Sequence, residues 1–73
     1  MLPERLTLLR KEKKLTQEEL SSKLHIGRSS YAHYEAAERK PGIDALINIA
    51  DFHSVSLDYL VGRTDIRKPY PKK

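Results

Sequence analysis

Residues 16–36 read TQEELSSKLHIGRSSYAHYEA, and this stretch decides the fold. Thr16 followed three positions later by Glu19 is a capping box, in which the threonine side chain caps one free amide and the glutamate reaches back to another. A helix therefore starts at Thr16, turns two leucines inward and ends at His25. Two residues then make a very short connection to the next helix.

That next helix begins at Arg28 and runs through about Ala36. At about 100° per residue, its side chains divide into an inward face with two tyrosine rings and an outward face of small or hydrogen-bonding groups. The outward residues are Arg28, Ser29, Ala32, His33 and Ala36, and the inward residues are Ser30, Tyr31, Tyr34 and Glu35. Such an outward face suits close approach to another surface, and the DNA major groove accepts a helix of this width. An ordinary amphipathic helix with a solvated face has the same pattern.

Three further helices flank this pair. Leucines at helical spacing and a proline in the first turn predict a helix over about 2–13. After a break at 39–42, a fourth helix is predicted by an apolar stripe of Ile43, Leu46, Ile47 and Ala50. A short fifth helix starts at Ser56 and ends at Gly62, and its inward set is Leu57, Leu60 and Val61. With no strand-like alternation, the fold class is all-α, a compact five-helix bundle.

Length and composition narrow the function. A chain of 73 residues and 8.4 kDa forms one small domain, which excludes most enzymes with separate substrate and cofactor domains. No apolar run approaches the ~18 residues that span a bilayer. The N-terminus has an acid and a proline where a secretory signal needs a basic and then an apolar stretch. We therefore expect a cytoplasmic protein, and the absence of cysteine leaves its stability to packing alone.

The net charge of +4 is confined to the C-terminal end. Residues 63–73 hold five basic side chains against one acidic, whereas residues 1–62 are formally neutral. The end of the chain also contains Pro69 and Pro71 and shows no periodicity. We therefore divide the chain into a helical domain at 1–62 and a basic, flexible tail at 63–73, and composition alone is weak evidence for DNA binding.

Several ordered motifs resemble those of one family. They are Leu15-Thr16-Gln17-Glu18-Glu19-Leu20, Leu24-x-Ile26, Arg28-Ser29-Ser30, Tyr34-Glu35, Arg39-x-Pro41, Ile49-Ala50-Asp51 and Val55-Ser56-Leu57-Asp58-Tyr59-Leu60. Together they are similar to the Xre / Cro-repressor class of helix-turn-helix proteins. The resemblance implies a lambda-repressor-like DNA-binding domain, in which the helices that start at Thr16 and Arg28 form the helix-turn-helix and the second of them enters the major groove.

The resemblance, together with the outward face, assigns DNA contacts to two groups of residues. The expected readers of base edges are Arg28, Ser29, Ala32 and His33. The expected phosphate contacts are Thr16, Gln17, Tyr34, Arg39 and Lys40. Each of these roles has a plain alternative: Arg28 could hold a phosphate instead of a base, Gln17 could be exposed to solvent, Ala32 could be kept small for clearance, and Arg39 and Lys40 could be a solvated charge pair in the loop.

The resemblance also implies an ion pair between Arg10 and Glu35, which ties the first helix to the third in similar proteins, and we expect it to be largely buried. For Tyr31 we expect a place in the core.

Four positions depart from the family pattern. His25, Ala37 and Ser54 stand where glycine is usual at a helix end, and Gly27 stands where a serine cap is usual. Histidine tolerates left-handed backbone better than most residues, and glycine is an acceptable cap. We therefore expect altered loop geometry within the same fold.

Catalytic, metal and cofactor sites have little support in this sequence. The three histidines are eight and twenty residues apart without a carboxylate at ligand spacing, which speaks against a metal site. The acidic pair Glu18 and Glu19 belongs to a helix start, where carboxylates favour the dipole. With no glycine-rich phosphate loop and no activated nucleophile, we expect no enzyme and no cofactor.

The leading interpretation is a sequence-specific regulator of transcription, a repressor of bacterial or phage type that binds double-stranded DNA at the nucleoid. One small domain contacts few base pairs, so we expect a homodimer on a near-palindromic operator. Its predicted contact surface is Leu57, Leu60 and Val61. Without a second domain, control would come from concentration, degradation or a protein antagonist. The alternatives are an antitoxin or other protein-binding module that caps a toxin, and a nonspecific DNA binder driven by the tail.

Overall fold

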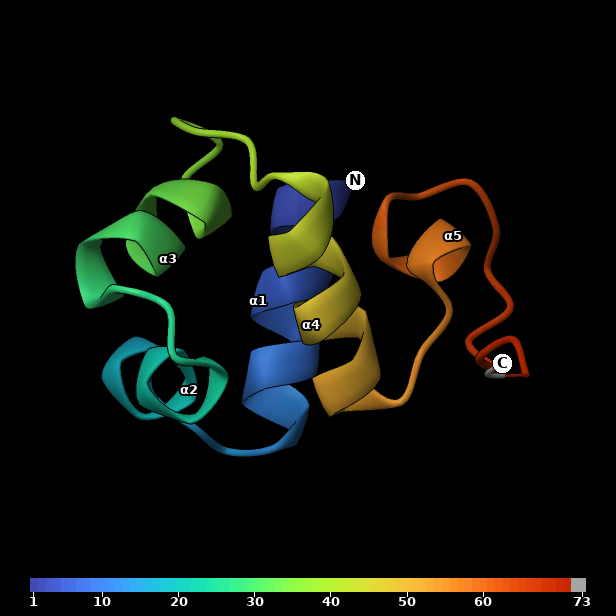
Figure 1. The fold of residues 1–73 in the computed structure, drawn as a ribbon, viewed down its shortest axis with the longest axis horizontal. Helices are drawn as coiled ribbons and strands as arrows, with labels where there is room; N and C mark the ends of the chain where they lie inside the picture. The colour runs from blue at the N-terminus through green and yellow to red at the C-terminus, as the bar shows by residue number, and fades with distance from the viewer. Residues whose placement is uncertain (72–73) are drawn as a thin grey trace.

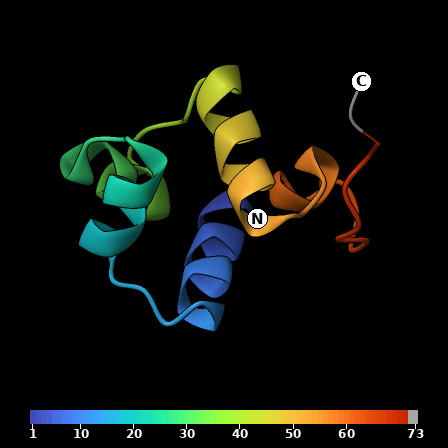
Figure 2. The same ribbon diagram turned by 60° about the horizontal axis from the view of Figure 1, so that its bottom comes forward.

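The computed structural model describes residues 1–71, and within them the fold is all-helical, as the sequence predicts. The helices are α1 (Leu2–Glu12), α2 (Gln17–Leu24), α3 (Arg28–Glu35), α4 (Ile43–His53) and α5 (Leu57–Leu60). α2 and α3 lie on one side of α1, and α5 with the residues that follow it up to Pro71 lies on the other (Figures 1 and 2). α1 contacts α3 and α5, while α4 contacts α2 and α5, which closes the bundle.

Side-chain caps begin the two helices where the sequence predicts them. The capping box at α2 is complete, because Thr16 Oγ1 accepts from the Glu19 amide at 3.0 Å and Glu19 Oε1 accepts from the Thr16 amide at 2.8 Å. At α5, Ser56 Oγ accepts from the Tyr59 amide at 3.0 Å. These caps satisfy amides that have no partner within their own helix.

Every helix within residues 1–71 ends in the same motif. A residue with left-handed backbone follows each last turn, and the amide after it bonds to the carbonyl five residues earlier, which defines the Schellman motif. The left-handed residues are Lys14 (φ 58°), His25 (57°), Ala37 (62°), Ser54 (55°) and Gly62 (88°). The turn between α2 and α3 therefore survives with a histidine in the glycine position.

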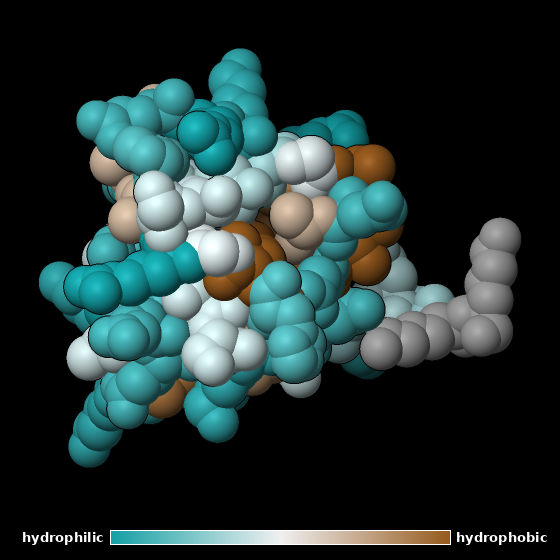
Figure 3. Space-filling view, turned by 60° about the vertical axis from the view of Figure 1, so that its left-hand side comes forward, coloured by the Kyte–Doolittle hydropathy of each residue, from teal (hydrophilic) through white to brown (hydrophobic). Residues whose placement is uncertain are grey.

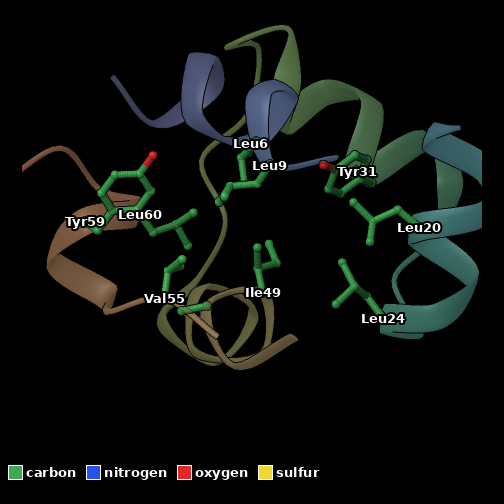
Figure 4. Packing of buried hydrophobic residues seen from close by; sticks show 10 residues of the cluster. Leu6, Leu9, Leu20, Leu24, Tyr31, Ile49, Val55, Tyr59 and Leu60 are labelled. Carbon is green, nitrogen blue, oxygen red and sulfur yellow. The ribbon is translucent and has the colours of Figure 1, made fainter. Parts of the chain in front are cut away.

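The core forms where the inner faces of all five helices meet (Figure 4). Its buried apolar residues are Leu6, Leu9, Leu20, Leu24, Tyr31, Ile49, Ala50, Val55, Tyr59 and Leu60. Tyr31 is fully buried, so its predicted place in the core is correct. The two helices of the predicted helix-turn-helix are thus held by Leu20, Leu24 and Tyr31 against the rest of the bundle.

The apolar stripe predicted for α4 is correct in part, because Ala50 is buried and Leu46 packs against the core, but Ile43 and Ile47 lie outside it. Ile43 and Ile47 are 60% and 45% exposed, whereas Ile49, Ala50 and His53 are buried. α4 carries two overlapping apolar stripes, one with Ile43 and Ile47 and the other with Ile49. Only the stripe with Ile49 is buried in the core. The reason is that α4 packs against both α2 and α5, which selects the face between them.

Residues 64–67 run back over α1 and α5, and we name them the C-terminal strap. Arg5 donates to the Thr64 carbonyl at 2.6 Å and to Asp65 at 2.7 Å, and the Ser56 amide donates to the Arg67 carbonyl at 2.8 Å. The Arg67 guanidinium forms a two-point pair with Glu12 at 2.8 and 2.9 Å. The flexibility that we expect for residues 63–73 stays a prediction. Residues 72 and 73 lie outside the part of the chain that the structure describes.

Candidate nucleic-acid interface

The outward face of α3 is accessible along its length. The Arg28 side chain is 70% exposed and Ser29 is exposed, while Ala32 and His33 are partly exposed. Figure 3 brings the side of α2 and α3 forward and shows a surface that is mainly hydrophilic or intermediate, with hydrophobic patches at its centre and toward its upper right. The four predicted base readers thus lie on one face and take no part in the core cluster.

Two carboxylates lie beside Arg28 and His33, the two predicted readers that are charged or ionisable. Glu18 Oε1 lies 3.7 Å from Arg28 Nη1, and both side chains are exposed, so this pair is weak. Glu38 Oε1 lies 2.7 Å from His33 Nδ1. The outward face of α3 therefore carries hydrogen-bond donors and acidic groups side by side.

The N-terminus of α2 presents the predicted phosphate-binding group of Thr16 and Gln17. Thr16 is exposed, but its hydroxyl already caps the helix. Gln17 is half-buried, because its side-chain amide donates to Glu35 Oε1 at 3.0 Å. The second amide hydrogen of Gln17 and the free backbone amides of the first turn are the donors that this helix start can offer to an anion.

Tyr34, Arg39 and Lys40 come together where the chain leaves α3. All three line one apolar pocket of about 310 Å³ that also touches Leu46 and Val61. Arg39 and Lys40 are exposed, and Arg39 reaches Ser30 Oγ at 3.4 Å. The two cations thus flank the C-terminal end of α3, while the readers begin at its N-terminal end.

The structure brings Arg10 and Glu35 together. Arg10 Nε lies 2.8 Å from Glu35 Oε2, and the two side chains are only 14% and 6% exposed. Thr7 also donates to Glu35, at 2.9 Å, and Arg10 donates to the Leu15 carbonyl at 2.9 Å. This network fixes α3 against α1 and orients Gln17 at the start of α2.

The predicted dimer surface on α5 needs one correction. Leu60 is fully buried in the core, so it cannot form part of any contact surface. Leu57 and Val61 are half-buried and remain available. The physical reason is that α5 is a single turn, and its fourth residue belongs to the buried core cluster.

Sequence reasoning missed the partners of the readers. The helix dipole accounts for Glu18 in the sequence, and no sequence pattern indicates a role for Glu38, although it contacts His33. Helical spacing does not reveal that contact, because the chain reverses after α3. The Schellman ending itself is the signal, since it returns the residue five positions later to the last turn.

No group of three or more histidine, cysteine or acidic residues within 1–71 is arranged to hold a metal ion. His53 is buried at the end of α4, and burial lowers its pKa to about 4, so it is neutral at physiological pH. Within the same residues, no helix is both long and apolar enough to span a membrane.

Three relatives share most of this chain's length. YobD of Bacillus subtilis (strain 168), an uncharacterized HTH-type transcriptional regulator, is 47% identical over 72 residues, which cover 99% of this chain and 62% of YobD. The HTH-type transcriptional regulator ImmR of the same organism is 36% identical over 92% of this chain and 53% of its own length. RstR of Vibrio cholerae serotype O1, a cryptic phage CTXphi transcriptional repressor, is 37% identical over 85% of this chain and 55% of RstR. The chain therefore spans a little over half the length of these relatives.

The helix-turn-helix family model matches residues 6–60, which begin within α1 and end with α5. The match includes the α2–α3 pair and nearly all of the core. The two lines of comparison agree with the five-helix arrangement and with the motifs that run from Leu15 to Leu60. This chain belongs to the Xre-type helix-turn-helix family.

Proposed function

We propose that this chain binds a specific double-stranded DNA sequence and regulates transcription, with α3 in the major groove. The observation that carries the proposal is the outward face of α3, where Arg28, Ser29, Ala32 and His33 are accessible and take no part in the core. Arg28 can pair with guanine at two points, and Ser29 and His33 can bond to base edges beside it. The names of ImmR and RstR as regulators support this role.

Phosphate contacts on both sides of α3 would fix its register in the groove. Gln17 and the first amides of α2 face one backbone, held in place by the bond from Gln17 to Glu35. Arg39 and Lys40 lie after the other end of α3, beside Tyr34. In this arrangement the phosphates position the helix and the four readers supply the sequence preference.

A second copy of the chain would double the recognised sequence. We infer a homodimer on a near-palindromic operator, with half-sites about one helical turn apart. Leu57 and Val61 supply its apolar contact, and Tyr70 extends it because its hydroxyl bonds to Asp58 of α5 at 2.6 Å. We further propose repression, the mode that the name of RstR as a transcriptional repressor favours, and action at the nucleoid in the cytoplasm.

Selection of bound sites from a random duplex pool at about physiological salt tests this function. We expect the chain to select a palindromic motif and an Arg28→Ala, His33→Ala double variant to lose preference at the positions these residues read. A Lys11→Ala, Lys68→Ala double variant is the matched control, because it removes two exposed positive charges away from α3. The proposal fails if the wild-type chain selects no motif, and a protein partner then becomes the object of the search.

A further inference from the structure

The end of α3 brings an acidic side chain back onto a base reader. Ala37 has left-handed backbone at φ 62°, and the Glu38 amide then donates to the His33 carbonyl at 3.0 Å. The Ala37 amide donates to the Tyr34 carbonyl at 3.3 Å, which completes the Schellman motif. Glu38 is thus held by its backbone directly beside His33, five residues earlier in the chain.

The side chains of these two residues meet through one ring nitrogen. Glu38 Oε1 lies 2.7 Å from His33 Nδ1, a distance typical of a charge-assisted hydrogen bond. An ionised carboxylate has only acceptor sites, so the hydrogen of this bond belongs to Nδ1. In a neutral imidazole that carries its proton on Nδ1, the other nitrogen, Nε2, has a lone pair and accepts.

The hydrogen-bond code of the major groove makes this tautomer informative. Cytosine presents an N4 amino donor there and adenine an N6 amino donor. Guanine presents the acceptors N7 and O6, and thymine presents the acceptor O4 and a methyl group. An Nε2 that accepts can therefore take a hydrogen bond from the amino group of cytosine or adenine. Against guanine or thymine it would meet another acceptor, which is unfavourable.

We propose that Glu38 is a positioning residue that fixes the His33 tautomer, so that Nε2 accepts a hydrogen bond and α3 selects cytosine or adenine at the position His33 meets. This inference rests on the proposed DNA-binding function and names the base class that one of its readers prefers. Glu38 acts through His33. If Glu38 only stabilised this exposed helix end, its removal would leave the preferred base unchanged.

The tautomer is tested in the free protein by ¹⁵N NMR of the histidine ring at about pH 8, where an imidazole carries one proton. We expect the His33 signals of the wild-type chain to show the proton on Nδ1. Glu38→Ala should move the proton toward Nε2, while Glu18→Ala, which removes the other carboxylate of this face, should leave it on Nδ1. A wild-type ring protonated on Nε2 would overturn the inference without touching the proposed function.

Base preference is tested with duplexes that differ only at the position where His33→Ala loses selectivity. We expect the wild-type chain to prefer cytosine or adenine by about tenfold, in the range of one good base contact. Glu38→Ala should reduce this preference to less than about twofold, change no other position, and add nothing to His33→Ala, because coupled residues are not additive. Glu18→Ala is again the control and should keep the preference.

The failures of the two proposals differ. A preference for guanine, or a preference that persists in Glu38→Ala, overturns the role of Glu38 while sequence-specific binding stands. If the wild-type chain selects no motif at all, the proposed function fails and the base selection falls with it, whatever the NMR tautomer.

Discussion

Glu35 joins three helices through one carboxylate. Its Oε2 accepts from Arg10, and its Oε1 accepts from Thr7 of α1 and Gln17 of α2. Burial by itself would raise the pKa of Glu35, but the hydrogen bonds, led by that from Arg10, outweigh burial and lower the pKa to about 2. The carboxylate is therefore charged in the folded protein, and the position of α3 depends on keeping its donors in place.

Removing one partner of this pair should destabilise the fold strongly. Arg10→Ala leaves the Glu35 charge buried with only neutral donors, so we expect the free energy of unfolding to fall on the order of 3 kcal/mol. Urea unfolding at neutral pH measures this change. Lys11→Ala, at the next and exposed position, is the control and should change stability by less than about 0.5 kcal/mol. An Arg10→Ala chain that unfolds at the wild-type midpoint would contradict the role of the pair.

The same variant has an expected signature in acid. Because the pKa of Glu35 is lower in the folded chain than in the unfolded chain, the unfolded chain binds the proton more readily. The stability contributed by Glu35 is therefore present above about pH 4.5 and is lost as the pH falls toward 2. This loss should be smaller in Arg10→Ala than in the wild-type chain.

At the scale of elements, the helix ends were only partly predictable. The family pattern points to His25, Ala37 and Ser54 as residues in glycine positions, and all three have left-handed backbone. Lys14 has the same conformation, and its residue type gives no signal of it. The Schellman bonds require that backbone whatever the side chain, so the geometry follows from where the helix ends and not from residue propensity.

Ser54→Gly should stabilise the chain. A Cβ in the left-handed region costs about 1 to 2 kcal/mol, and glycine removes this cost while it adds freedom to the unfolded chain. We expect a net gain of about 0.5 to 1 kcal/mol, measured as a higher urea midpoint with an unchanged slope. Ser22→Gly, inside α2 and exposed, is the matched control and should lower stability. A loss of stability in Ser54→Gly would show that the serine has a role its backbone does not explain.

At the scale of the whole molecule, local signals and distant contacts differ in what the sequence can predict. The capping box at Thr16, the cap at Ser56 and the outward face of α3 are local, and the sequence predicts them. Arg5 meets Asp65 and Glu12 meets Arg67 across 60 and 55 positions, which no periodicity indicates. These contacts, and the choice between two stripes on α4, depend on how the helices pack.

The candidate site divides in the same way. Helical spacing places the four proposed readers on one face, because that face belongs to a single helix. The pairing of His33 with Glu38 follows only from the chain reversal after α3, and that of Arg28 with Glu18 only from the packing of α2 on α3. The sequence therefore predicts which side chains share a face of one helix, but it does not predict side-chain pairs that depend on a chain reversal or on helix packing.

The net positive charge of the chain lies at its C-terminal end. Residues 1–62 are formally neutral and the end of the chain carries the net charge of +4, yet Arg67 already faces Glu12 and Arg63 faces Asp58. The C-terminal strap also accepts hydrogen bonds from Arg5 and from the Ser56 amide. Deleting residues 63–73 would therefore disturb the fold as well as the net charge. Substituting only the lysines of this end separates the two effects.

In the triple variant Lys68→Gln, Lys72→Gln, Lys73→Gln, we expect affinity for the selected site and for unrelated duplex to fall by a similar factor. Phosphate attraction carries no sequence information, so the selected motif should stay the same. The slope of log affinity against log salt should become shallower, by about 0.9 for each lysine that contacts a phosphate. Glu12→Gln, which weakens the strap without removing a positive charge, is the control and should leave this slope unchanged. A motif that disappears in the triple variant would mean that the tail, and not α3, carries the DNA recognition.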